Sequence, residues 1–196
     1  MGQEGRRILM ASPGFVMAPE GMPTYASRRR AQGVPMTATP LIVHREIVRP
    51  GYADYNQHLA DGYYLVIFSD STTGLMDHIG LGSAEREATG HTLFTLEVHA
   101  NYLKEVKVGT EVSVACQILA YDQKRLHIFH SMYAGDSTEP VATTEQMQSN
   151  YDMKAQRTAP FLPEVMAKIE AIARQQAEMP RPSQVGRIIG LPPKKS

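Results

Sequence analysis

The sequence predicts an α+β fold in which a curved antiparallel sheet of about five strands wraps around one long central helix. Two observations lead to this architecture. Residues 92–151 contain four segments typical of β-strands, and no connection between them is long enough for the crossover helix that parallel strands need. A long amphipathic segment precedes these strands, and one curled sheet buries both that helix and one of its own faces.

The first strand and the central helix begin the predicted domain. Residues 41–48 indicate a strand, which ends before Pro50. Apolar residues then recur at intervals of three, four and seven, which places on one helical face Tyr64, Leu65, Phe68, Leu75, Met76 and Ile79. Gly80 suits the left-handed residue that ends such a helix, and Leu81 suits the hydrophobic contact that accompanies this ending.

Four further strands and a second helix follow. Apolar and polar residues alternate over 92–103, and a polar turn over 122–125 joins two of the later strands. The expected strands are 92–103, 112–118, 126–133 and 141–151. An apolar stripe predicts a C-terminal helix over 163–177.

The chain divides into three parts. Residues 1–40 are rich in proline, carry three consecutive arginines and show no sustained periodicity, so we expect an irregular N-terminal extension. Residues 41–178 form the predicted domain. Residues 179–196 form a C-terminal tail, and its apolar residues Ile188, Ile189 and Leu191 suggest that it docks onto the domain.

Composition argues against several classes of protein. Lys plus Arg and Asp plus Glu number 20 each, so the chain lacks the positive excess typical of a protein that binds nucleic acid. Cys116 is the one cysteine, so no intramolecular disulfide forms. No apolar run approaches the ~20 residues of a membrane helix, and the N-terminal apolar stretch is too short for a signal peptide. We therefore expect a cytoplasmic protein that binds neither nucleic acid nor a membrane.

The polar segment Asp54-Tyr55-Asn56-Gln57-His58 lies directly before the central helix and concentrates the reactive side chains. A carboxylate in this position can act as a general base or a nucleophile. The free N–H groups of the first helical turn can hold a developing oxyanion. These groups suffice to hydrolyse an activated acyl group without a metal. The residues alone also allow a simpler interpretation, because Asp and Asn favour turns and helix caps.

The run from Asp54 to Leu65, followed by Phe68, resembles the hotdog-fold thioesterases of the 4-hydroxybenzoyl-CoA thioesterase branch. In that branch an Asp precedes the central helix, and a Tyr-Leu pair follows ten residues later, as Tyr64 and Leu65 do here. The resemblance covers about residues 41–155. The motif Asp-Tyr-Asn-x-His, followed by Tyr-Tyr-Leu, is most similar to the corresponding segment of betainyl-CoA thioesterases of carnitine degradation.

The resemblance implies roles for individual residues. It assigns Asp54 as nucleophile or general base, with Asn56 and His58 as supporting catalytic groups. It also implies that the backbone N–H groups of Asp61 and Gly62 hold the oxyanion. The Asp61 side chain itself has a simpler interpretation as the N-cap of the helix.

The expected substrate is a small acyl-CoA thioester, and coenzyme A is part of that substrate, so no separate cofactor is expected. We expect the substrate to contact Tyr63 and Tyr64, because a quaternary ammonium favours aromatic faces. Glu97 and His99 share one side of their strand and are also expected to contact the substrate or a second subunit. The resemblance makes Glu97 the second candidate for the catalytic carboxylate, because some hotdog branches place that group on another element facing the central helix. A solvent-facing role is equally open for Glu97 and His99. No metal is expected, because His127 and His130 are three apart on a strand and so lie on opposite faces. The uncovered sheet surface predicts a homodimer or homotetramer.

Two rival functions remain open. A hotdog-fold enoyl-CoA hydratase also has Asp, Asn and His before the helix, but its motif has a proline after Asn and places His one residue later. A non-catalytic acyl-CoA-binding regulatory module would act through a partner. An α/β-hydrolase is disfavoured because Gly-x-Ser-x-Gly is absent. Cys116 falls among apolar neighbours and is expected in the core rather than as a nucleophile.

Overall fold

The computed structural model describes residues 40–191 of the chain. The chain divides after residue 35, and all described residues belong to the second unit, 36–196. The first unit, which includes the arginine run, lies outside the described residues, as does nearly all of the expected 1–40 extension. The last five residues of the C-terminal tail also lie outside them.

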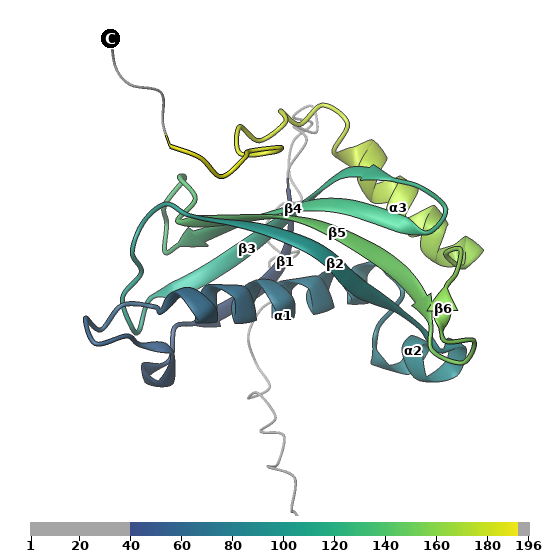
Figure 1. The fold of residues 1–196 in the computed structure, drawn as a ribbon, viewed down its shortest axis with the longest axis horizontal. Helices are drawn as coiled ribbons and strands as arrows, with labels where there is room; N and C mark the ends of the chain where they lie inside the picture. The colour runs from purple at the N-terminus through teal and green to yellow at the C-terminus, as the bar shows by residue number, and fades with distance from the viewer. Residues whose placement is uncertain (1–39, 192–196) are drawn as a thin grey trace, which may run out of the picture. The chain divides into compact units, whose positions relative to one another are not determined.

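One curled antiparallel sheet forms the framework, as predicted (Figure 1). Its five long strands are β1 (Leu41–Ile47), β2 (His91–Tyr102), β3 (Glu111–Tyr121), β4 (Arg125–Ala134) and β5 (Ala142–Asp152). They lie in the order β1-β3-β4-β5-β2, and a two-residue strand β6 (Arg157–Thr158), which the sequence did not predict, pairs with β5. Strand β2 therefore has a partner on one side only.

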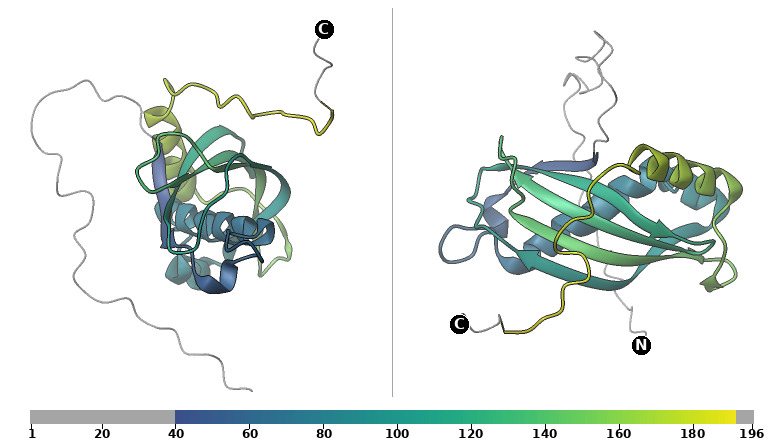
Figure 2. Two further views of the ribbon diagram at one scale, coloured as in Figure 1. Left: turned by 90° about the vertical axis from the view of Figure 1, so that its left-hand side faces the viewer. Right: turned by 90° about the horizontal axis from the view of Figure 1, so that it is seen from above.

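The long helix α1 (Asp61–Ile79) lies across the concave face of the sheet (Figures 1 and 2). Gly80 ends it with φ 84°, and the Leu81 N–H donates to the Met76 carbonyl oxygen at 2.8 Å, which confirms the predicted ending. The helix approaches β1 so closely at Gly74 that a Cβ there would overlap the Val43 carbonyl oxygen. This close approach fixes where α1, and therefore its N-terminus, lies on the sheet.

Most of the predicted apolar face of α1 is buried, but Leu65 is not. Its side chain is 41% exposed, whereas Ile67, which was not predicted to lie on this face, is completely buried. Leu65 is instead one of three partly exposed residues in this turn of the helix, with Tyr63 and Val66. The prediction for Leu65 was wrong because the sheet covers a narrower part of the helix there than the spacing indicated.

The C-terminal helix α3 (Pro163–Gln175) packs on α1 and β3, and a short helix α2 (Ser83–Thr89) and a 3₁₀ turn η2 (Pro50–Tyr52) complete the domain. Pairing of β1 with β3 stops at Leu41 and Cys116. Beyond that point the buried Gln176 side chain takes the place of a neighbouring strand. Its Oε1 accepts from the Ile118 N–H and its Nε2 donates to the Cys116 carbonyl oxygen, both at 2.8 Å.

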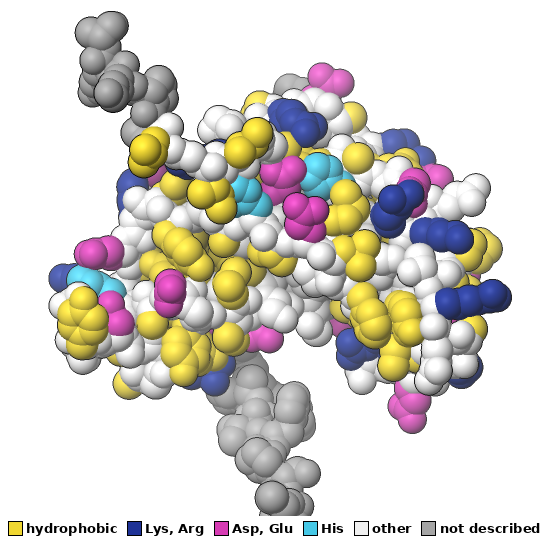
Figure 3. Space-filling model, viewed as in Figure 1, with side chains coloured by type: hydrophobic (Ala, Val, Ile, Leu, Met, Phe, Trp, Pro, Cys, Tyr) yellow, Lys and Arg dark blue, Asp and Glu magenta, His cyan; other side chains and the backbone are white. Residues whose placement is uncertain are grey.

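The edge strand β2 differs from its predicted pattern. A β-bulge between Thr95 and Glu97 interrupts the alternation expected over 92–103. The bulge shifts the register by one residue, so Phe94, which pairs with Ser149, and Val98, which pairs with Gln146, face opposite sides of the sheet. Phe94, Leu96 and Val98 are 42%, 60% and 43% exposed. Figure 3 shows hydrophobic side chains gathered on this side of the molecule, over β2 and the adjacent part of α1.

The described part of the C-terminal tail runs over the face of the sheet opposite α1 (Figure 2). Its contacts are polar: the Gly186 N–H donates to the Glu145 carboxylate at 2.6 Å, and Arg187 donates to the Asn101 side chain at 3.2 Å. Its apolar residues Ile188, Ile189 and Leu191 remain exposed instead of docking. Among the described residues, no helix is long and apolar enough to cross a membrane.

Candidate active site

The loop between β1 and α1 is built around Asp54. Its Oδ1 accepts the N–H of Asn56 at 2.8 Å and that of His58 at 3.0 Å, and its own N–H donates to the His58 carbonyl oxygen at 2.8 Å. Gln57, with φ 63°, makes the turn. The turn role of Asp54 is therefore real, but it occupies one carboxylate oxygen. Oδ2 has no hydrogen-bond partner within residues 40–191, so it remains available for chemistry.

The N-terminus of α1 offers one free donor. Ala60 is the N-cap, so the prediction that Asp61 caps the helix was wrong; Asp61 is the first helical residue. Its Oδ1 accepts the N–H of Gly62 at 2.8 Å, and the Tyr63 N–H donates to the Ala60 carbonyl oxygen at 2.9 Å. Of the two N–H groups assigned to the oxyanion, that of Gly62 is thus occupied. That of Asp61 has no acceptor in the described part of the chain.

A cavity of about 360 Å³ joins this loop and helix to the chain that follows β2. It is lined by Asp54, His58, Leu59, Asp61, Tyr64, Tyr102, Leu103, Lys104 and Glu105. Backbone pairing holds the two sides together: the Leu59 N–H donates to the Val106 carbonyl oxygen at 2.7 Å, and His58 pairs with Lys107. The free carboxylate oxygen and the free helical N–H therefore belong to residues that line one cavity.

Two tyrosines form one wall of the cavity. The rings of Tyr64 and Tyr102 meet edge to face with centroids 5.3 Å apart. The Tyr64 hydroxyl donates to the Lys104 carbonyl oxygen and the Tyr102 hydroxyl donates to the Asp61 carbonyl oxygen, both at 3.2 Å. Burial raises the pKa of both phenols, and for Tyr102 the charge of Asp61 raises the pKa further. Both rings therefore stay neutral at physiological pH.

The cavity carries more acidic than basic groups. Asp54, Asp61 and Glu105 line it, against Lys104 and the titratable His58. Glu105 lies 3.6 Å from the His58 Nδ1, although its side chain is 78% exposed. In such a polar cavity the free helical N–H can bind the oxygen of a carbonyl compound. The carboxylate can then either activate a water molecule or attack the carbonyl carbon directly.

Sequence comparison assigns the family. The sequence model of the thioesterase-like superfamily matches residues 48–169, which include the loop, α1, strands β2 to β6 and part of α3. The chain belongs to the thioesterase-like superfamily. It is 48% identical over 153 residues to a betainyl-CoA thioesterase of Pseudomonas aeruginosa, covering 78% of this chain and 96% of that one. The enzyme is therefore a thioesterase.

Other relatives agree with this assignment. An L-carnitine dehydrogenase/betainyl-CoA thioesterase of Agrobacterium fabrum is 39% identical over 147 residues, which cover 75% of the present thioesterase and 30% of that longer protein. A crystal structure of a thioesterase candidate from Pseudomonas putida superposes with a TM-score of 0.70 at 42% identity, covering 82% and 99% of the two chains. A Staphylococcus aureus protein solved in complex with CoA superposes with a TM-score of 0.72 at 33% identity, covering 78% and 97%.

The remaining predicted site residues of the thioesterase lie elsewhere. Asn56 is exposed and does not line the cavity; its backbone, rather than its side chain, contacts Asp54. Tyr63 stacks on Tyr52 with ring centroids 4.4 Å apart. Glu97 and His99 line a second cavity of about 260 Å³, together with the C-terminal tail. Within one chain they are therefore not brought together with Asp54.

Part of the cavity wall was not predicted from the sequence. Tyr102 ends β2, and Leu103, Lys104 and Glu105 follow it; none of the four was assigned to the site. Their sequence signal is weak because they lie about 40 residues from α1 and approach it only through the fold.

Cys116 and the two histidines of β4 agree with prediction. Burial raises the pKa of the Cys116 thiol, so it is a core residue and not a nucleophile. His127 pairs with Glu145, whereas His130 is buried against Phe68. The two histidines therefore lie in different surroundings, as expected for opposite faces of a strand.

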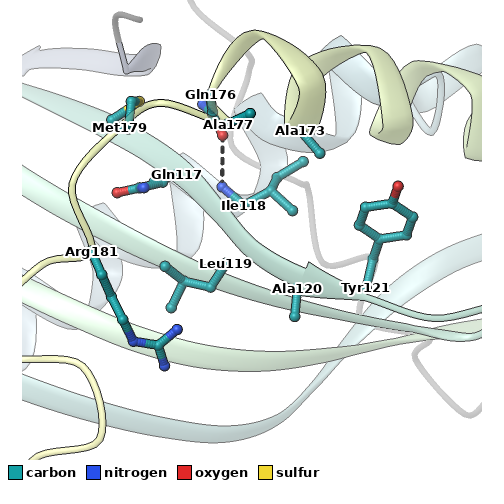
Figure 4. Close-up of a pocket in the computed structure, with 10 residues that line it drawn as sticks. All are labelled: Gln117, Ile118, Leu119, Ala120, Tyr121, Ala173, Gln176, Ala177, Met179 and Arg181. Atoms are coloured by element: carbon teal, nitrogen blue, oxygen red, sulfur yellow. Dashed lines mark hydrogen bonds between the residues drawn. The ribbon is translucent and has the colours of Figure 1, made fainter.

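A further pocket of about 250 Å³ lies far from this loop, between β3 and the end of α3 (Figure 4). Gln176 and Ile118 lie at its upper edge, where the dashed line marks the hydrogen bond from the Ile118 N–H to the Gln176 side chain. Arg181 lies at the other side of the pocket. None of its lining residues belongs to the loop or to the first turn of α1. The pocket therefore shares no lining residue with the cavity at Asp54.

Proposed function

We propose that this thioesterase hydrolyses betainyl-CoA to betaine and free CoA, at the cavity that Asp54 lines. The observation that carries the proposal is local: the free Oδ2 of Asp54 and the free N–H of Asp61 belong to residues that line the same cavity. The name of the Pseudomonas aeruginosa relative, 48% identical, supports the choice of acyl group.

In the proposed reaction the thioester carbonyl oxygen accepts the Asp61 N–H, which stabilises the negative charge that develops on that oxygen. In one route Asp54 removes a proton from the attacking water and passes it to the leaving CoA thiolate. In the other, Asp54 attacks the carbonyl carbon itself and expels CoA thiolate, and water then hydrolyses the acyl–Asp54 anhydride to betaine and the free carboxylate. A positioned base contributes roughly 10²–10⁴ in rate, and one oxyanion donor roughly 10²–10³. The base comes from a loop that is held by hydrogen bonds of Asp54 to Asn56 and His58, and the donor comes from the first residue of α1.

We also propose that two copies associate through β2. This strand has one free edge, twelve residues long, and exposes Phe94, Leu96 and Val98. A long apolar edge is a template for pairing with another strand unless something covers it. The exposed flank of α1 at Leu65 and Val66 would add apolar area to the same contact. Because Tyr102 ends β2 and lines the cavity with the residues after it, such a dimer would bring a second copy close to the cavity.

A panel of acyl-CoA thioesters tests the proposed reaction. Betainyl-CoA, acetyl-CoA, 4-hydroxybenzoyl-CoA and crotonyl-CoA are incubated with the full chain, while free thiol and enoyl absorbance are followed together. We expect thiol release, fastest with betainyl-CoA. Loss of enoyl absorbance without thiol would identify a hydratase. Saturable binding without either signal would identify a binding module.

A further inference from the structure

The residue whose backbone is proposed to hold the oxyanion also carries a carboxylate. Asp61 keeps that carboxylate at the cavity, where its Oδ1 accepts the Gly62 N–H at 2.8 Å. An anionic side chain next to an oxyanion site opposes the negative charge that the carbonyl oxygen gains. With a neutral acyl group, this arrangement would therefore slow the reaction.

We infer that the Asp61 carboxylate and the ring of Tyr102 bind a positively charged acyl group and make the enzyme select cationic acyl thioesters. The Tyr102 ring is 49% exposed and packs edge to face on Tyr64, which is 4% exposed and supports it. The inference rests on the proposed thioester hydrolysis and adds to it the residues that determine specificity.

A fixed positive charge reverses the electrostatic effect of Asp61. In an acyl group that carries a quaternary nitrogen one methylene from the carbonyl, that nitrogen lies about 2.5 Å from the carbonyl carbon by ordinary bond lengths. Any carboxylate close to the oxyanion is then also close to the cation. The attraction between Asp61 and the cation offsets the repulsion between Asp61 and the oxyanion.

The ring of Tyr102 is suited to the same cation. Tyr64 and Tyr102 direct their hydroxyls to backbone carbonyl oxygens, and both line the cavity. Neutral phenol rings attract quaternary ammonium groups through their faces. The Tyr102 hydroxyl donates to the carbonyl oxygen of Asp61 itself, so the ring is anchored to a residue that lines the same cavity. The pKa of Tyr102 is raised first by burial and then by the charge of Asp61, in agreement with this proximity.

The other two carboxylates of the cavity are less suited to this role. Asp54 is the group proposed to react, and its Oδ1 is held by the loop. Glu105 lies beside the His58 ring and is mostly exposed to water, which weakens its interaction with any ligand. A carboxylate in the first turn of a helix also stabilises the helix dipole. That structural role would affect every substrate equally, which gives the test its discriminating power.

The test compares betainyl-CoA with 3,3-dimethylbutanoyl-CoA, in which carbon replaces the quaternary nitrogen and the shape is retained. Asp61→Asn keeps an oxygen that can accept the Gly62 N–H but removes the charge. We expect kcat/KM for betainyl-CoA to fall roughly 10–100-fold in this variant, while kcat/KM for the neutral isostere rises. Asp136→Asn, an exposed carboxylate in another loop, is the matched control. Equal losses on both substrates would overturn the inference.

Binding of two unreactive thioethers separates this inference from the proposed hydrolysis. S-(2-trimethylammonioethyl)-CoA and S-(3,3-dimethylbutyl)-CoA differ only in charge and cannot be hydrolysed. By calorimetry, the wild type should bind the cationic thioether at least about tenfold more tightly, and Asp61→Asn and Tyr102→Leu should each reduce that ratio. If no thioester is hydrolysed but this preference exists, the proposed function fails and the cation site stands. Equal affinities in the wild type would overturn the cation site.

Discussion

Asp54 and His58 are joined by two backbone contacts of opposite direction: the Asp54 N–H donates to the His58 carbonyl oxygen at 2.8 Å, and the His58 N–H donates to the Asp54 Oδ1 at 3.0 Å. The pair closes the loop before α1 into a rigid turn. One carboxylate oxygen is consumed by this turn and the other is left at the cavity. The same residue thus fixes its own position and carries the carboxylate oxygen that we propose to react.

The proposed contact through β2 predicts a dimer that a single charge disrupts. Leu96→Glu places a carboxylate on the exposed edge strand, where burying it against a second copy would be costly. We expect light scattering after gel filtration to give twice the chain mass for the wild type and the chain mass for the variant. Ile188→Glu, at an exposed apolar residue of the tail, should leave the dimer intact. A wild type that is monomeric at micromolar concentration would contradict the proposal.

The buried Gln176 should contribute more to the free energy of unfolding than the exposed Gln175 beside it. Gln176→Ala would leave the Ile118 N–H and the Cys116 carbonyl oxygen without partners in a buried setting. Each buried polar group without a partner costs about 1–3 kcal/mol, so we expect the free energy of unfolding to fall by about 2–4 kcal/mol in urea titrations. The exposed Gln175→Ala is the control and should change it by less than about 0.5 kcal/mol. Equal effects of the two changes would show that the side chain does not replace a strand.

Because His130 is buried, we predict that the free energy of unfolding falls in mild acid. Burial lowers its pKa to about 3, while an unfolded histidine titrates near 6.5. The unfolded chain therefore binds the proton more tightly, and stability is lost as the pH falls from about 6.5 toward 3. The slope is about 1.4 kcal/mol per pH unit for this one group. In His130→Gln, urea titrations between pH 7 and pH 4.5 should show a slope smaller by about this amount. A slope equal to that of the wild type would mean that His130 has the same pKa in the folded and the unfolded chain.

Local chemistry explains which parts of the fold the sequence predicted. The end of α1 depends on Gly80 and Leu81 alone, and the turn at 122–125 depends on Asp122, whose Oδ1 accepts the N–H groups of Lys124 and Arg125 at 2.8 and 2.7 Å. Long-range features were not predictable in this way. The exposure of Leu65 depends on which strand reaches the flank of α1, and the role of Gln176 depends on where β1 stops.

The candidate site likewise contains residues that the sequence predicted and residues that only the fold brings there. Asp54, His58, Asp61 and Tyr64 lie within eleven residues of one another, so a single segment and its family resemblance identified them. Glu105 enters the cavity only because residues 106 and 107 pair with the loop at 58 and 59. Glu97 and His99 share the polar side of β2 in sequence, but the structure directs them to a cavity beneath the tail. Their role in the substrate site stays a prediction.

The measurement that tests the central claim most directly is thiol release from betainyl-CoA by Asp54→Asn. This variant keeps an oxygen that can accept the Asn56 and His58 N–H groups, so the loop should survive, and circular dichroism and the melting temperature check this. We predict that kcat falls roughly 10²–10⁴-fold, whereas Asp136→Asn retains wild-type activity. An Asp54→Asn enzyme that hydrolyses betainyl-CoA at the wild-type rate would contradict the assignment of Asp54 as base or nucleophile.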